Sequence, residues 1–168
     1  VIDENSLWRI DPIDTLAQDG VYEYTLESID IAGNKKTLSQ DFTLDTVAPV
    51  FSGGLSAVSD SGQSDSDGVT NKGAPTFDGS GEVNATVLLT FANGTTYTSV
   101  VDATGRWQVV LPTPLAAGDY NYTLSSTDIA SNTRTLPVAT LKIDTVAELT
   151  VTGLTSASNS YYLESSDG

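Results

Sequence analysis

Apolar and polar residues alternate in short runs along most of the chain. In the central part these runs fall at residues 50–58, 75–78, 85–91, 97–101, 106–111, 120–126 and 136–144. Because successive side chains of a strand point to opposite faces, a period of two predicts half-buried β-strands. No segment keeps the 3.6-residue period of an amphipathic helix. The pattern therefore predicts an all-β fold.

Turn-forming residues separate the predicted strands. Asn93-Gly94 predicts a tight hairpin with a type I′ turn, because both residues accept a positive φ. Gly105 ends the next predicted turn. Pro112 and Pro114 must leave the sheet, because proline has no N–H for a central ladder. About seven short strands joined in this way predict an immunoglobulin-like Greek-key β-sandwich.

The same motifs occur twice, about 99 residues apart. The matching pairs are Trp8 and Trp107, Tyr22-Glu-Tyr-Thr-Leu26 and Tyr120-Asn-Tyr-Thr-Leu124, Asp30-Ile-Ala and Asp128-Ile-Ala, and Asp45-Thr-Val-Ala48 and Asp144-Thr-Val-Ala147. We therefore expect tandem repeats, with the end of one unit at 1–48, a complete unit at 49–147 and the start of a third at 148–168. The outer two have too few strands to form a core alone. The abrupt start at Val1, within strand-like sequence, suggests a piece of something longer.

The aromatic residues of the complete unit have structural interpretations. Trp107 shares a strand face with Val109 and Leu111, which predicts a core position. Tyr120 and Tyr122 share a face in the strand before the last. Their position predicts a tyrosine corner, in which a tyrosine hydroxyl binds the backbone a few residues upstream.

Composition and charge narrow the possible functions. The 168 residues include 22 acidic and 7 basic ones, giving a formal net charge of −15, so nucleic acid and anionic membrane surfaces are poor partners. The chain has no Cys or His, which excludes disulfides and thiolate chemistry and disfavours zinc or iron sites. No apolar run approaches the length of a membrane-spanning helix, and no signal peptide is visible.

The acidic loop, which we define as residues 59–71, is the strongest candidate site. Asp60, Asp65 and Asp67 lie within eight residues, surrounded by Ser and Gly and without a basic residue among them. Ca²⁺ accepts six to eight oxygen ligands from carboxylates, carbonyls and water in flexible loops. The loop does not follow the EF-hand pattern. We predict that it binds Ca²⁺ near a junction between units.

Other carboxylates lie at predicted turns. Two sites per junction are conceivable: one with Asp45, linker carbonyls and a neighbouring carboxylate, the other with the acidic loop, completed by Glu82. Simple sandwich topology places Asp30 and Asp45 at opposite ends of a unit. In the third unit only Glu164 and Asp167 remain as carboxylates of the corresponding loop, so we expect a weaker site or none there.

Several ordered motifs of the chain resemble one protein family. Asp45-Thr-Val-Ala-Pro49, the acidic loop, Gly79-Ser-Gly-Glu82, Gly105-Arg-Trp107 and Thr127-Asp-Ile-Ala-Ser-Asn132 look like the tandem bacterial Ig-like repeats of giant, type I-secreted, non-fimbrial adhesins. The resemblance implies secreted stalk modules on the bacterial surface, stiffened by Ca²⁺ near their junctions. On the matching motifs it implies metal ligands at Asp60, Asp65, Asp67, Asp30, Asp128, Asp45, Asp144 and Glu82.

Three classes of function follow. The first is a non-catalytic, monomeric stalk segment, whose partners are the neighbouring repeats and, for the parent protein, a host-cell or surface receptor. The second is a carbohydrate- or receptor-binding module, which needs an exposed aromatic platform; Tyr97, Tyr161 and Tyr162 are its candidates. The third, an enzyme, has the weakest basis because the chain has no His or Cys and its carboxylates lie in loops of small residues instead of an apolar cleft.

Overall fold

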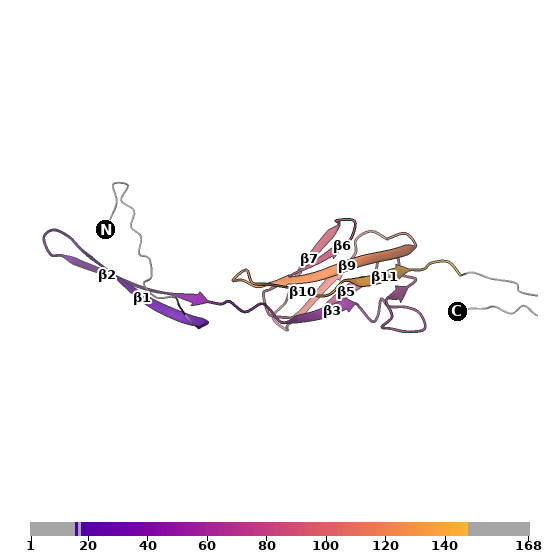
Figure 1. The fold of residues 1–168 in the computed structure, drawn as a ribbon, viewed down its shortest axis with the longest axis horizontal. Helices are drawn as coiled ribbons and strands as arrows, with labels where there is room; N and C mark the ends of the chain where they lie inside the picture. The colour runs from indigo at the N-terminus through magenta and orange to yellow at the C-terminus, as the bar shows by residue number, and fades with distance from the viewer. Residues whose placement is uncertain (1–15, 17, 148–168) are drawn as a thin grey trace, which may run out of the picture.

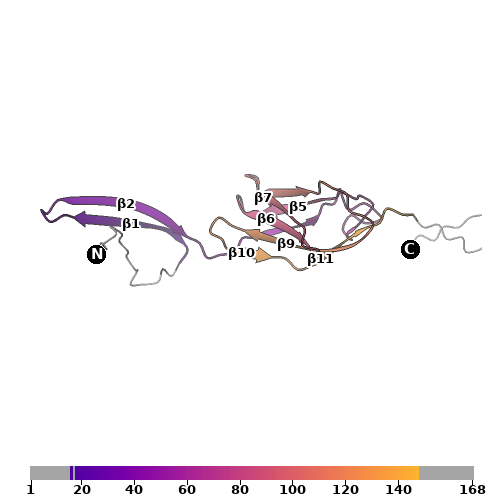
Figure 2. The same ribbon diagram turned by 90° about the horizontal axis from the view of Figure 1, so that it is seen from above.

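The computed structural model describes residue 16 and residues 18–147. This part of the chain consists of strands and connecting loops, which confirms the all-β prediction. A long hairpin and a β-sandwich follow one another along the longest axis of the molecule (Figures 1 and 2). No helix in the described part is long and apolar enough to cross a membrane.

The hairpin consists of β1 (Gly20–Ile29) and β2 (Lys35–Leu44), which pair antiparallel along their whole length. Its tip, residues 30–34, lies at the end of the molecule away from the sandwich, and residues 45–50 form the linker into it (Figure 1). Leu38 and Phe42 are about half exposed. The described hairpin therefore has no core of its own.

The sandwich has two sheets. One contains β3 (Phe51–Leu55), β5 (Thr76–Gly81) and β8 (Arg106–Val110), in that order. The other has the order β4-β11-β9-β6-β7, with β10 also paired to β9. Its strands are β4 (Val69–Thr70), β6 (Thr86–Phe91), β7 (Thr96–Val100), β9 (Gly118–Thr127), β10 (Thr133–Thr135) and β11 (Ala139–Ile143).

Alternating side chains from both sheets fill one core, as the sequence pattern predicts. Phe77 and Leu89 are fully buried, and Tyr122 packs edge-on against Phe77 with ring centroids 5.0 Å apart. Trp107 is 3% exposed and lies in the same cluster as Val109 and Leu111. The core assignment of these three residues is confirmed, and with it the immunoglobulin-like sandwich.

The tyrosine-corner prediction is also confirmed. The Tyr120 hydroxyl donates to the carbonyl oxygen of Ala116 at 3.0 Å. In the hairpin, the Tyr22 hydroxyl donates to the carbonyl oxygen of Gln18 at 2.6 Å. Both bonds span four residues, so the two repeats share this local structure.

Three local features differ from the sequence prediction. Only Gly94 has a positive φ in the β6–β7 turn, and its N–H donates to Phe91; a type I′ turn, which needs two positive φ values, is therefore wrong here. The predicted strand 136–144 is interrupted at Pro137, between β10 and β11, because proline cannot donate to the ladder. The sequence pattern also missed β4, whose two residues are too few to alternate.

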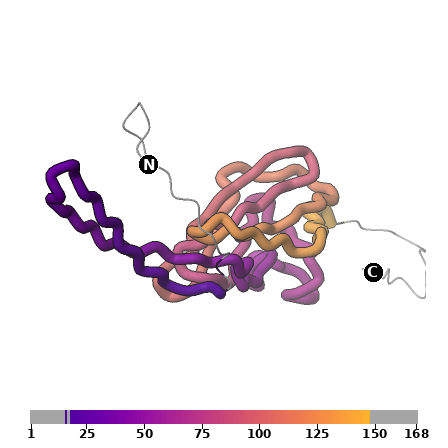
Figure 3. Tube along the Cα trace, turned by 60° about the vertical axis from the view of Figure 1, so that its left-hand side comes forward, coloured from indigo at the N-terminus to yellow at the C-terminus, as the bar shows by residue number. Residues whose placement is uncertain are grey.

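The loops of the sandwich gather at two ends, which we call the linker end and the acidic end. The linker end holds residues 45–50, the β5–β6 loop and the β9–β10 loop at residues 128–132. The acidic end holds the loop between β3 and β5 and the point where β11 ends. Figure 3 shows the hairpin meeting the sandwich at the linker end and the chain leaving at the other end after β11.

Candidate functional site

Asp60 is the buried member of the acidic loop. Its side chain is 5% exposed, and its Oδ2 accepts a 3.0 Å hydrogen bond from the N–H of Gly68. Its Oδ1 is buried without a hydrogen-bond partner among the described residues. A buried carboxylate oxygen that lacks a partner is costly, so this atom is suited to a cation or another donor.

The other two aspartates of the loop lie at its surface. Asp65 and Asp67 are exposed, and Asp67 Oδ1 accepts the N–H of Val69 at 3.0 Å in an Asx turn. An open pocket is lined by the loop from Asp60 to Asp65. Within the described residues, no three acidic side chains lie close enough to form a metal-binding group. The three aspartates thus share a loop but do not converge on one point.

Hydroxyl groups hold the frame of the acidic loop. Thr70 is fully buried and its hydroxyl donates to the carbonyl oxygen of Ser59. Ser61 Oγ lies 2.9 Å from Thr70 Oγ1 and donates to Asn71 Oδ1 at 2.8 Å. Ser59 Oγ accepts the N–H of Thr76, the first residue of β5. Sequence reasoning counted carboxylates here and missed these hydroxyls, whose ordering depends on contacts across the loop.

Tyr122 connects the acidic loop with the core. Burial raises the pKa of the Tyr122 hydroxyl, the negative charge of Asp60 raises it further, and a backbone hydrogen bond from Leu55 acts in the opposite direction. Asp60 is itself only 5% exposed and therefore lies at the inner side of the loop.

The loops at residues 30–34 and 128–132 have matching hydrogen bonds. Asp30 accepts from the backbone and side-chain amides of Asn34 at 2.8 and 2.7 Å. Asp128 accepts the same two bonds from Asn132 at 2.8 and 2.9 Å. Hydrogen bonds from Asn34, chiefly from its side chain, lower the pKa of Asp30. Burial acts to raise the pKa of Asp128, but the bonds from Asn132 and the loop backbone outweigh it and lower that pKa.

One contact joins the linker to the β9–β10 loop. The side-chain amide of Asn132 donates to the carbonyl oxygen of Asp45 at 3.1 Å, across 87 residues of sequence. Asp30 follows β1 and Asp45 follows β2, so the two residues lie at opposite ends of the antiparallel hairpin, as predicted. The amide of Asn132 was not among the predicted site residues, although its place in the repeated Asp-Ile-Ala motif marks it.

Asp45 and Asp144 begin their linkers with the same turn. Asp45 Oδ1 accepts the N–H of Val47 at 3.0 Å, and Asp144 Oδ1 accepts that of Val146 at 3.2 Å. The backbone of Asp144 also touches the acidic loop, because its N–H donates to the carbonyl oxygen of Thr70 at 2.8 Å. The structure therefore brings Asp144 to the acidic end and Asp45 to the linker end.

The predicted pairing of Glu82 with the acidic loop is wrong. Glu82 follows β5 and, together with Val47 and Ala48, lines a groove at the linker end. The acidic loop instead contacts the opposite end of β5, at Thr76. A strand of six residues separates the two sites. Glu164 and Asp167, the remaining predicted ligands, lie outside the described residues.

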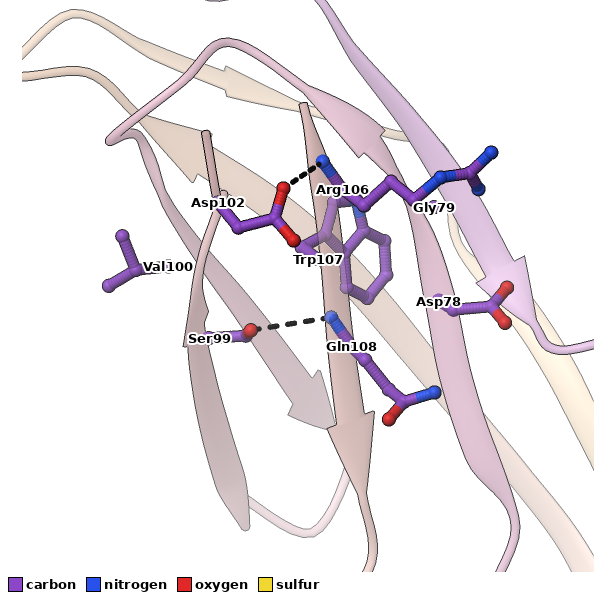
Figure 4. Close-up of a pocket in the computed structure, with 8 residues that line it drawn as sticks. All are labelled: Asp78, Gly79, Ser99, Val100, Asp102, Arg106, Trp107 and Gln108. Carbon is purple, nitrogen blue, oxygen red and sulfur yellow. Dashed lines mark hydrogen bonds between the residues drawn. The ribbon is translucent and has the colours of Figure 1, made fainter. Parts of the chain in front are cut away.

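A polar groove lies beside β7 and β8 and is lined in part by Asp78, Asp102, Arg106 and Gln108 (Figure 4). Hydrogen bonds, the strongest from the side chain of Thr104, lower the pKa of Asp102. Trp107, which also lines the groove, is 3% exposed and donates its indole N–H to the carbonyl oxygen of Ser52. It therefore does not form an exposed stacking surface.

Tyr97 is also unsuited to a binding platform. It is half-buried and packs edge-on against Phe91, with ring centroids 6.3 Å apart. Tyr161 and Tyr162 lie outside the described residues. Neither Trp107 nor Tyr97 therefore supports an aromatic sugar-binding surface.

Comparison with known proteins identifies the family. The family model for the bacterial Ig-like domain matches residues 47–145, more than half of the chain. A crystal structure of a tetra-tandem repeat in the extending region of a large adhesion protein is 21% identical, with a TM-score of 0.44 over 76% of this chain. That match covers 32% of the other chain, so the present chain spans about a third of it. No curated protein matches the sequence. The chain belongs to the bacterial Ig-like domain family.

Proposed function

We propose that the chain is a segment of the extracellular stalk of a large bacterial adhesin, in which Ca²⁺ stiffens the junctions between Ig-like units. Family membership, the internal repeat and the end-to-end placement of hairpin and sandwich support this proposal. The role is structural and non-catalytic. A receptor on a host cell or another surface would be contacted by the parent protein.

The observation that carries the calcium proposal is the buried Asp60. A carboxylate oxygen that is buried and without a partner among the described residues favours a nearby cation. Asp60 and Asp65 also line one open pocket together with Ser61 and Ser64, residues that carry oxygen donors. Oxygen donors of this kind suit Ca²⁺, which completes its coordination with water where protein ligands are few.

The position of the acidic loop would allow a bound cation to act on the following junction. β4, which ends the loop, pairs parallel with β11, the last strand of the sandwich. The N–H groups of Lys142 and Asp144 donate to the carbonyl oxygens of Gly68 and Thr70, each at 2.8 Å. A cation that orders this loop would therefore also order the point where the chain enters the next linker.

Calorimetric titration with Ca²⁺ tests the site. We expect the wild-type chain to bind Ca²⁺ and Asp60→Asn to lower the affinity at least about tenfold, because one anionic ligand is lost. At a free Ca²⁺ concentration about 100 times Kd, binding should add about 2.7 kcal/mol to the stability of the unit. Thermal unfolding with Ca²⁺ and with EDTA measures this change.

Two variants serve as controls for the titration. Asp41→Asn removes one negative charge from an exposed position of β2, and Glu82→Gln removes one at the linker end. Both should retain the wild-type affinity. If Asp60→Asn binds as tightly as these controls, or the wild-type chain takes up no Ca²⁺, the proposed site is wrong.

A further inference from the structure

We propose that Asn132 fastens the linker to the sandwich without a metal ion, so that the two halves of a junction are held by different means. The first half lies between a unit and the linker that leaves it, and the second lies between that linker and the next unit. The inference extends the proposed stalk function to the second half, but it requires no Ca²⁺.

The two copies of the loop show what the linker contact adds. The loop at residues 30–34 and the loop at 128–132 have the same bonds from asparagine to aspartate. Asn132 makes one further bond, to the carbonyl oxygen of Asp45. Asp30 is exposed, whereas Asp128 is 6% exposed. The hydrogen bonds between asparagine and aspartate thus form in both loops. Within the described residues, only the loop at residues 128–132, whose aspartate is buried, also contacts the linker.

The conformation of the linker exposes the carbonyl oxygen of Asp45 to Asn132. The side chain of Asp45 folds back to accept the N–H of Val47, which leaves the backbone carbonyl oxygen to accept from Asn132. Asp144 makes the same turn in the second linker. Pro49 is fully buried in the sandwich and anchors the other end of the linker. The Asx turn and the hydrogen bond from Asn132 hold the linker at Asp45, and the buried Pro49 holds its other end.

The bonding at Asp128 provides protein donors in place of a cation. Both of its carboxylate oxygens accept hydrogen bonds from Asn132, whereas Oδ1 of Asp60 has no partner in the described part of the chain. Asp128 is therefore satisfied by protein donors, whereas Asp60 at the acidic end retains an unmet acceptor. Removal of divalent cations should loosen the first half of a junction and leave the second half ordered.

Heteronuclear NOE values of the linker amides test the inference. In the full chain with EDTA, the N–H groups of Thr46, Val47 and Ala48 should have the high values typical of the sandwich strands. Asn132→Ala should reduce them to values typical of mobile chain ends, with and without Ca²⁺. Asn34→Ala, which removes the same internal bonds from the loop without a linker contact, should leave them unchanged.

The possible outcomes separate this inference from the calcium proposal. If the linker amides stay ordered in Asn132→Ala, or if they are ordered in the wild type only when Ca²⁺ is present, Asn132 does not act as proposed. If Asn132→Ala does not fold, Asn132→Ser, whose side chain is too short to reach Asp45, replaces it in the same measurement. The failure of Ca²⁺ to bind would leave the expected result in EDTA unaltered.

Discussion

At the scale of single residues, two glycines allow Trp107 to enter the core. Gly79 faces Trp107 across β5 and β8, and Gly53 pairs with Gly79 across β3 and β5. The indole lies against both glycines and donates to the carbonyl oxygen of Ser52 at 3.0 Å. Any side chain at these positions would occupy the space of the indole. Glycine at positions 53 and 79 is therefore required by the packing of Trp107.

Gly79→Ala should strongly destabilise the unit. A Cβ at this position would lie 2.8 Å from Trp107 Nε1 and would clash with the carbonyl oxygen of Ser52. We expect a loss of about 3 kcal/mol in the free energy of unfolding, because overpacking displaces both backbone and indole. Chemical denaturation measures it. Gly62→Ala, whose Cβ would have its nearest neighbour at 3.7 Å, should change stability by less than about 0.5 kcal/mol, and equal effects would contradict this account.

At the scale of elements, the strands were predictable from the sequence and the positions of the loops were not. Alternation located the strands, because burial of every second residue is a local property. The break at Pro137 shifted a boundary, and β4 was missed. Which loops meet depends on topology: the strand before Glu82 was predicted at residues 75–78 and extends to Gly81. The end of the sandwich at which Glu82 lies becomes clear only from the pairing of β3 with β5. The linker contact of Asn132 likewise depends on a partner 87 residues away.

The β9–β10 loop should respond to acid. Hydrogen bonds lower the pKa of Asp128 below its ordinary value of 3.8, so its contribution to stability is complete above that value and is lost as the pH falls through the lower folded-state pKa. In thermal unfolding, the wild type should therefore have a higher melting temperature than Asp128→Asn at pH 7. The difference between their melting temperatures should shrink below pH 3.8. Asp41→Asn, on exposed β2, reports the general effect of one lost charge. A difference from Asp128→Asn that is constant with pH would contradict this assignment.

At the scale of the whole molecule, charge and architecture favour an extended array. A net charge of −15 makes neighbouring units repel one another and opposes their collapse. Linkers as short as residues 45–50 limit the relative motion of the units they join. Charge repulsion alone does not fix the orientation of one unit relative to the next, however. We propose that a cation at the acidic end holds the first half of each junction and that the amide of Asn132 holds the second half.

Small-angle scattering of a three-unit chain tests the central claim, that Ca²⁺ stiffens the junctions. Residues 49–147 repeated in tandem restore the natural linker, because Ala147 followed by Pro49 recreates the sequence of residues 45–49. We predict a larger maximum dimension and a narrower spread of conformations with Ca²⁺ than with EDTA. The same chain with Asp60→Asn in every unit should give the EDTA result in both solutions. A maximum dimension that is unchanged by Ca²⁺ in the wild-type chain would contradict the claim.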